Sequence, residues 1–140
     1  MFLLDTNVLS AIMAAQPPPA VAAWIARQPD DLLFTASICQ AEILAGIAIL
    51  PDGRRRKALE TAARAIFIDD FQGRVLPFDA AAAIAYAAIF ASRQKAGRST
   101  APLDLMIAAI AFANGAAVVT RDSSGFEFCA VQIVNPWRSP

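Results

Sequence analysis

Short apolar segments that suit β-strands alternate along this chain with longer segments that suit α-helices. The strand-like segments are 2–4, 32–35, 75–76, 117–120 and 131–134. Strands this short and this apolar are buried on both faces, which is typical of a parallel sheet covered by helices. The pattern therefore predicts a three-layer α/β/α fold with a central, mainly parallel sheet of about five short strands.

Proline, glycine and capping residues predict where the helices begin and end. Asp5 or Thr6, then Ser37 and Asp79, suit positions at helix N-termini. Arg56, Glu60 and Arg64 follow one another at intervals of four, which predicts an exposed face of ion pairs. The expected helices span residues 6–13, 19–27, 37–49, 54–68, 79–95 and 102–113.

The apolar residues are distributed in a way that favours a cytosolic protein with buried interfaces over a membrane protein. Apolar residues make up 57% of the 140 residues, above the roughly 45–50% of an ordinary soluble domain. No uninterrupted apolar run reaches the roughly 18 residues of a membrane-spanning helix, and the start of the chain lacks the basic region of a signal peptide. We therefore expect one cytoplasmic domain over residues 1–140, with no membrane contact and with its excess apolar surface covered by protein partners.

Charge and residue chemistry narrow the function further. Basic and acidic residues number 12 each, whereas a free-standing nucleic-acid binder usually has a basic excess; the basic block 54–57 suits a solvated first helical turn. The chain has no histidine, which excludes Ser-His-Asp and Cys-His catalysis and histidine ligation of metals. Cys39 and Cys129 are too few for a zinc site and are expected to be reduced and buried.

Four acidic residues, Asp5, Glu42, Asp104 and Asp122, lie in apolar stretches. A carboxylate there is costly unless it is paired, hydrogen-bonded or bound to a metal. Asp5 and Asp122 follow predicted strands, at the sheet edge where open α/β folds bind ligands. Right-handed crossovers would bring Glu42 and Asp104, which lie early in their helices, to the same edge.

Three of these acids also have structural explanations. Asp5 suits an N-cap, Asp104 the first turn of a helix, and Asp122 an Asx turn. Glu42 differs, because the helix around it is almost entirely apolar and no lysine or arginine lies within one turn of it. We expect that helix to be buried, so that Glu42 needs a partner.

Converging carboxylates would call for a cation. Two of them about 4 Å apart repel by roughly 4 kcal/mol at an effective dielectric near 20, so ions must bind or protons must be taken up. Mg²⁺ or Mn²⁺ suits a shell of carboxylates and water. Two such ions would balance the four charges, and one would leave the site negative. Such a site fits metal-assisted hydrolysis of phosphodiesters.

The segments around these acids resemble the PIN domain, in order and over essentially the whole chain. They are 3–9 (Leu-Leu-Asp-Thr-Asn-Val-Leu), 37–42 (Ser-Ile-Cys-Gln-Ala-Glu), 104–109 (Asp-Leu-Met-Ile-Ala-Ala) and 120–122 (Thr-Arg-Asp). Segments 50–56, 73–79 and 135–137 are similar to the FitB-like branch of the single-domain toxins of VapBC-type toxin–antitoxin modules.

This resemblance implies a PIN-like fold and a metal-dependent endoribonuclease, the toxin of a type II pair, which hydrolyses RNA and inhibits translation and growth. Its partners would be a cognate antitoxin, through which alone operator DNA is bound, and a second copy of the chain. The cofactor would be Mg²⁺ or Mn²⁺. The metal-binding catalytic acids would be Asp5, Glu42, Asp104 and Asp122. Polar neighbours that orient acids or waters would be Thr6, Asn7, Ser37 and Thr120, and Arg121 would contact the phosphate or brace Asp122.

Two departures from the family pattern concern rate and substrate preference more than reaction class. Pro102-Leu103 stand where small residues are more common, and Cys39 where threonine is common. Two alternatives to the endoribonuclease make different demands on the chain. A haloacid-dehalogenase-type phosphatase would need aspartate in place of Asn7 and a lysine after Arg98, and the chain has neither. An RNA- or metal-binding regulatory module with a PIN fold would bind RNA without cleaving it in Mn²⁺.

Overall fold

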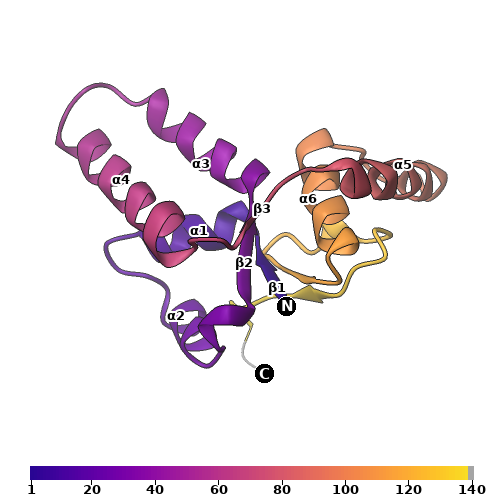
Figure 1. Cartoon of the computed structure of the whole chain (residues 1–140), viewed down its shortest axis with the longest axis horizontal. Helices are drawn as coiled ribbons and strands as arrows, with labels where there is room; N and C mark the ends of the chain where they lie inside the picture. The colour runs from indigo at the N-terminus through magenta and orange to yellow at the C-terminus, as the bar shows by residue number, and fades with distance from the viewer. Residues whose placement is uncertain (139–140) are drawn as a thin grey trace.

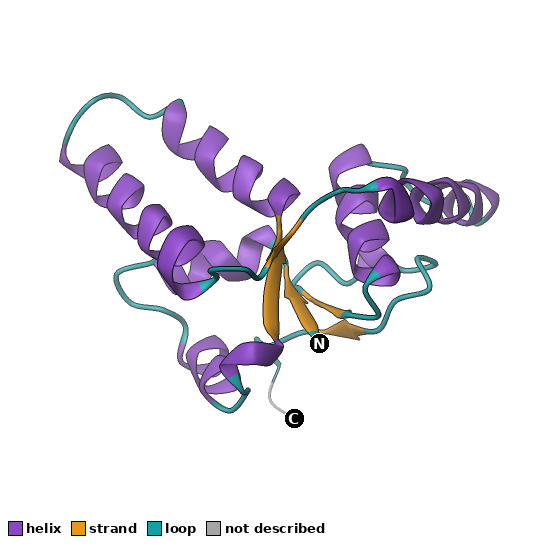
Figure 2. Ribbon diagram, in the orientation of Figure 1, coloured by secondary structure: helices purple, strands orange, loops and turns teal. Residues whose placement is uncertain are grey.

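A computed structural model describes residues 1–138, and within them five short strands form one central sheet (Figure 2). Each pairing between these strands is parallel, so the sheet is wholly rather than mainly parallel. Its strand order is β3-β2-β1-β4-β5. The strands are β1 (Phe2–Leu4), β2 (Leu33–Ala36), β3 (Val75–Leu76), β4 (Ala117–Val119) and β5 (Ile133–Val134).

Six α-helices within residues 1–138 cover the two faces of the sheet, which confirms the predicted α/β fold (Figure 1). The connections from β1 through β2 to β3 cross the sheet in one direction and the connection from β3 to β4 returns, so right-handed crossovers place their helices on opposite faces. On one side lie α1 (Thr6–Met13), α2 (Pro19–Ala26), α3 (Ser37–Ala48) and α4 (Arg54–Arg64); on the other lie α5 (Ala80–Lys95) and α6 (Pro102–Ala113).

The helix expected over residues 54–68 is two segments. α4 ends at Arg64, and a π-helical segment, Ala65–Asp70, follows it. The Phe71 N–H donates to the Ile66 carbonyl at 2.8 Å, five residues back, and both side chains are buried. In an α-helix these two residues would be turned about 140° apart, so core packing overrides the α-helical pattern here.

Helix caps were predicted with mixed success. Asp5 caps α1 and Asp79 caps α5, each accepting a main-chain N–H, at 2.8 and 2.9 Å. Ser37 does not cap α3; it is the first residue of that helix, and the N-cap before it has no side chain that could accept a hydrogen bond. β2 begins one residue later than expected because Asp30–Leu32 form a short 3₁₀ turn, and β5 is shorter than the expected 131–134.

α3 is not buried as its apolar composition suggested. Cys39, Ile43 and Ile47 are buried along one stripe, whereas Leu44 is 46% exposed and Ile49, the C-cap residue that follows the helix, is 85% exposed. The prediction was wrong because α3 and α4 pack against each other and project away from the sheet (Figure 1). No element within residues 1–138 covers the other face of α3.

The core itself is centred on the sheet and α6. Leu3 and Val118 are fully buried, as is the α6 segment 107–111. Cys39 and Cys129 are free and buried, as expected. The described residues include no helix with the length and apolar character needed to cross a membrane.

The basic block 54–57 forms the first turn of α4. Within it, Arg56 contacts Asp52 at 3.2 Å and Glu60 at 2.9 Å. Arg64 takes part in none of the ion pairs among the described residues, so the predicted ion-pair face is only partly formed. Exposed pairs of this kind contribute little to stability.

Candidate carboxylate active site

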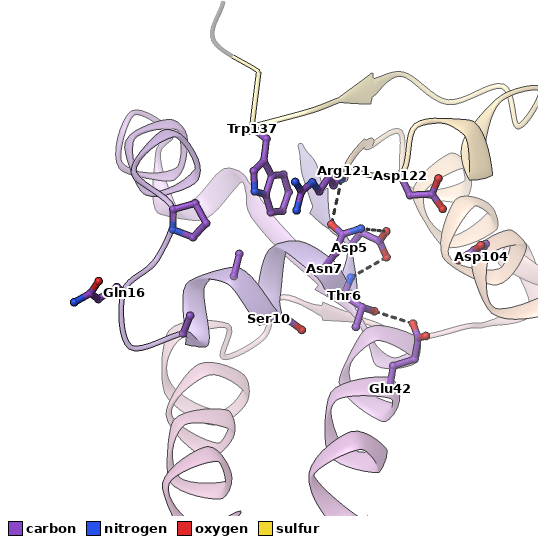
Figure 3. Close-up of a pocket in the computed structure, with 13 residues that line it drawn as sticks. Asp5, Thr6, Asn7, Ser10, Gln16, Glu42, Asp104, Arg121, Asp122 and Trp137 are labelled. Atoms are coloured by element: carbon purple, nitrogen blue, oxygen red, sulfur yellow. Dashed lines mark hydrogen bonds between the residues drawn. The ribbon is translucent and has the colours of Figure 1, made fainter. Parts of the chain in front are cut away.

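The four acids singled out from the sequence line one cleft at the carboxyl edge of the sheet (Figure 3). Asp5 directly follows β1, and Asp122 lies in the loop after β4. Glu42 lies in the second turn of α3 and Asp104 in the first turn of α6. The cleft has a volume of about 700 Å³. The strand order thus brings together acids that are far apart in the sequence.

Asp5 is the most buried member of the set, at 5% exposed. Its Oδ1 accepts from the Thr6 main-chain N–H, and its Oδ2 accepts from the Thr120 hydroxyl, both at 2.8 Å. The Thr120 oxygen in turn accepts from the Asn7 side-chain amide at 3.1 Å and from the Asp122 main-chain N–H at 3.0 Å. Thr120 therefore connects the acid after β1 to the acid after β4.

The pKa of Asp5 is raised from 3.8 to about 6, the balance of several effects of which burial is the largest. The hydrogen bonds from Thr120 and Thr6 lower this pKa, and the charges of Asp104 and Glu42 raise it further. The influence of these two charges places all three carboxylates within electrostatic reach of one another. In the metal-free protein, ionising Asp5 therefore costs free energy.

Glu42 reaches the cleft from α3 and is half-buried rather than buried. Its Oε1 accepts from the Thr6 hydroxyl at 2.7 Å. This hydroxyl is the partner that the sequence around Glu42 lacks. Since the Thr6 main-chain N–H also bonds Asp5, Thr6 holds two of the acids at once.

Asp104 and Asp122 form a more open part of the cleft. Asp104 is half-buried and Asp122 is exposed. Burial raises the pKa of Asp104, the nearby charges of Asp122 and Glu42 raise it further, and the Arg93 guanidinium lowers it. Like Asp5, Asp104 is therefore a carboxyl group whose ionised form is disfavoured by its surroundings.

Gly125, which sequence reasoning missed, leaves room for these two acids. A Cβ at this position would lie 2.8 Å from Asp122 Oδ2 and 3.4 Å from Asp104 Oδ2. The other Asp122 oxygen, Oδ1, accepts from the Ser124 hydroxyl at 3.0 Å and from the Gly125 N–H at 3.3 Å. Asp122 is thus held by the turn that follows it, although the main-chain N–H that it binds lies three residues on rather than the two of an Asx turn, while Oδ2 faces Gly125.

Arg93 is a buried cation that sequence reasoning also missed. It is 3% exposed. Its Nε donates to the Ser99 carbonyl at 2.9 Å, and its Nη1 donates to the carbonyls of Ser124 and Glu127 at 3.0 Å each. These bonds join the loop before α6 to the loop that follows Asp122. A signal existed, since Arg93 continues the spacing of the residues that α5 buries: Ala82, Ala85 and Ile89.

Arg121 lines the cleft but does not brace Asp122. Its guanidinium points away from Asp122 and lies over the Trp137 ring, with Cζ 5.2 Å from the ring centroid (Figure 3). Its main-chain N–H donates to Asn7 Oδ1 at 3.2 Å. Ser37, by contrast, is half-buried at the start of α3 and is not among the described residues that line the cleft.

The donors in the cleft suit a hard divalent cation, because all four are carboxylates. The neighbouring thiol is unsuited, since burial raises the pKa of Cys39 to about 12 and keeps it protonated. Among residues 1–138, no three acidic or thiol groups converge closely enough to hold an ion as they stand. Glu42 and Asp104 are half-buried and Asp122 is exposed, so these three side chains have more rotamer freedom than Asp5.

Comparison with known proteins identifies the family. Residues 2–131 match the family model of the PIN domain. VapC ribonuclease Y4jK of Sinorhizobium fredii is 40% identical over 137 residues, which cover 98% of each chain. Toxin FitB of Neisseria gonorrhoeae is 35% identical over 137 residues, which cover 98% of this chain and 99% of FitB. The structure of FitAB bound to the IR36 DNA fragment superposes with a TM-score of 0.93 at 34% identity, covering 100% of this chain and 98% of that one.

The chain belongs to the PIN-domain family. Within that family it is a homologue of VapC ribonuclease toxins of toxin–antitoxin systems, as its sequence resemblance predicted. The haloacid-dehalogenase-type alternative is therefore excluded.

Proposed function

We propose that this protein is a Mg²⁺- or Mn²⁺-dependent endoribonuclease, the toxin of a type II toxin–antitoxin pair, which inhibits translation and growth by hydrolysing cytoplasmic RNA. The observation that carries the proposal is the gathering of Asp5, Glu42, Asp104 and Asp122 in one cleft. The raised pKa of Asp5 and of Asp104 supports it, because uncompensated negative charge is what a cation site requires. The likeness to VapC ribonuclease Y4jK supports RNA as the substrate.

In this proposal the four acids hold the cation, with Asp5 as the fixed ligand. When bound, the cation supplies charge that stabilises the phosphate in the transition state and lowers the pKa of the attacking water. Thr6 and Thr120 hold Asp5 in one orientation, and the Thr6 hydroxyl holds Glu42. Asn7 fixes the main chain of Arg121, whose guanidinium offers positive charge to the RNA backbone at the edge of the cleft.

Two protein partners complete the proposal. Two exposed apolar side chains, Leu44 on α3 and Ile49 at its C-cap, suit a protein interface better than open solvent. A cognate antitoxin would cover the active cleft and would alone bind the operator DNA, which is consistent with the zero net charge of this chain. A second copy of the chain would form a homodimer. The structure named FitAB bound to IR36 DNA supports an assembly of this kind.

The test is RNA cleavage by the purified chain, free of any partner. RNA should be cut in Mg²⁺ or Mn²⁺ and left intact in EDTA, and an excess of Mn²⁺ should restore cutting. Asp104→Asn should abolish cleavage, and Asp31→Asn, at an exposed acid outside the cleft, should leave it unchanged. Cleavage that persists in EDTA would refute the metal mechanism. RNA binding without cleavage in Mn²⁺ would favour the regulatory module instead.

A further inference from the structure

One wall of the cleft carries an aromatic ring and a guanidinium that the proposed hydrolysis does not require together. Trp137 and Arg121 both line the cleft and lie against each other, above Asp5 and Asn7 in Figure 3. We propose that this pair is a subsite in which an unpaired nucleobase stacks on Trp137 while Arg121 holds its phosphate. The inference rests on the proposed function for the choice of RNA.

The indole ring is held in place by the chain around it. Trp137 follows β5 by three residues, its main-chain N–H donates to Asn135 Oδ1 at 2.9 Å, and Pro136 between them is buried. The ring packs in part against the core and remains half-buried. A large flat ring that is fixed and partly accessible is what base stacking requires, because little side-chain freedom is lost on binding.

The guanidinium over the ring is available to an anion. Arg121 is exposed, it is the one cation among the described residues that line the cleft, and it enters none of the ion pairs formed within residues 1–138. Arg98, which lies over Phe128 in a similar way, differs because it pairs with Glu127 at 3.3 Å. A guanidinium presents its N–H donors in a planar fork that matches two phosphate oxygens.

The position of the pair specifies the kind of nucleic acid. A base can stack on a wall of this cleft only if its face is free, whereas in a duplex both faces are covered by neighbouring base pairs. Stacking on an aromatic ring is tolerant of base identity, so the subsite selects unpaired over paired RNA more than one base over another. Arg121 also offsets the repulsion between phosphate and the four acids at the point of entry.

Tryptophan fluorescence tests this directly, because the chain has only two tryptophans. Trp24 lies on α2, with its ring against Phe2 at 5.1 Å between centroids, and is outside the cleft. In Trp24→Phe protein, a single-stranded oligouridylate or oligoadenylate added in EDTA should quench the remaining fluorescence of Trp137, and a duplex of the two should quench it far less. In Trp137→Phe protein, where only Trp24 emits, neither RNA should change the signal.

Affinity measurements give the second half of the test. Trp137→Ala should weaken binding of the single-stranded RNA about tenfold, within the range of stacking contributions, and Trp137→Phe should recover most of it. Arg121→Gln should weaken binding and lower the slope of log affinity against log salt by about one. Phe112→Ala, at an exposed aromatic residue on the distal end of α6, is the matched control and should change neither.

Two results would overturn the subsite: fluorescence of Trp137 that stays constant as RNA is added, or an unchanged affinity in Trp137→Ala. An effect of Trp137→Ala on antitoxin binding alone would assign the ring to the protein partner. Failure of the proposed function looks different, since the protein would then quench and bind normally in EDTA but leave RNA intact in Mn²⁺.

Discussion

The two halves of the cleft are built differently. Asp5 is buried at the end of a central strand, with hydrogen bonds from Thr6 and Thr120 that fix both of its oxygens. Asp104 and Asp122 lie on a helix start and a loop, are more exposed, and face each other across Gly125. One half is rigid and electrostatically strained, and the other can adjust.

This difference in burial and hydrogen bonding shows how one cleft can combine a fixed carboxylate with movable ones. The strand ends hold one carboxylate in place at an energetic cost, because burial disfavours its ionised form. The other carboxylates, on a helix start and in a loop, are more exposed and less constrained. Arg93 joins the loop before α6 to the loop after Asp122 through its hydrogen bonds, and it does not line the cleft itself.

Removing the charge of the rigid half should have the largest effect. Asn is as good an N-cap as Asp, so Asp5→Asn should keep α1 intact and still abolish cleavage. It should also stabilise the metal-free protein at pH 7 by about 3 kcal/mol, because the pKa shift from 3.8 to about 6 is removed. Urea unfolding in EDTA and an RNA cleavage assay measure the two effects. Retained cleavage, or a loss of stability, would show that Asp5 is not a strained ligand.

Arg93→Met should destabilise the loops that position Asp104 and Asp122. Three loop carbonyls would lose their charged donor, which should lower the free energy of unfolding by about 3 kcal/mol and the Tm by roughly 10 °C. Thermal unfolding checks this. The matched control is Arg98→Met, which removes an exposed ion pair and should cost no more than about 1 kcal/mol. Equal losses in the two variants would contradict the role given to Arg93.

Acid should stabilise the metal-free protein. Since the folded state binds the Asp5 proton more tightly than the unfolded state, this contribution is complete below pH 3.8 and is lost as the pH rises through about 6. It amounts to about 3 kcal/mol, and it should be missing from the stability profile of Asp5→Asn. Saturating Mg²⁺ should oppose the trend, because the cation binds the ionised acids. Identical profiles for wild type and Asp5→Asn would refute the burial argument.

Thr120→Val should have the smallest effect of the four. The substitution keeps the shape of a buried side chain but removes the hydroxyl that connects Asp5 to Asp122. We expect kcat to fall about 10- to 100-fold, the range for residues that orient metal ligands, with little change in KM. Thr61→Val, which removes an exposed hydroxyl on α4, is the control. A wild-type kcat in Thr120→Val would mean that Asp5 needs no such support.

Features set by local sequence were predictable from the chain. Apolar runs placed the strands, and Asp79 and Pro102 marked the starts of their helices. The errors concern contacts between distant segments. The exposure of α3 depends on how far it projects beyond the sheet, and the π-helical turn at Ile66 depends on what the core requires.

The site divides in the same way. Asp5 and Asp122 could be placed because strand ends share an edge, but the hydroxyl partner of Glu42 comes from the start of another helix. The burial of Arg93 could have been predicted, because it continues the spacing of the buried residues of α5. Trp137 lies in segment 135–137, which resembles the FitB-like branch, but its spacing did not place it at the cleft, because only the path of the chain after β5 brings it there.

The assembly of the cleft from β1, α3, α6 and the loop after β4 has a consequence during synthesis. A nascent chain carries Asp5 long before the fourth acid is added at residue 122, and β4 must insert beside β1 to bring that acid into place. A ribosome that stalls earlier on this message releases a fragment without the full set of carboxylates. The proposed nuclease activity therefore requires that synthesis has passed residue 122, so that shorter products of the same message lack it.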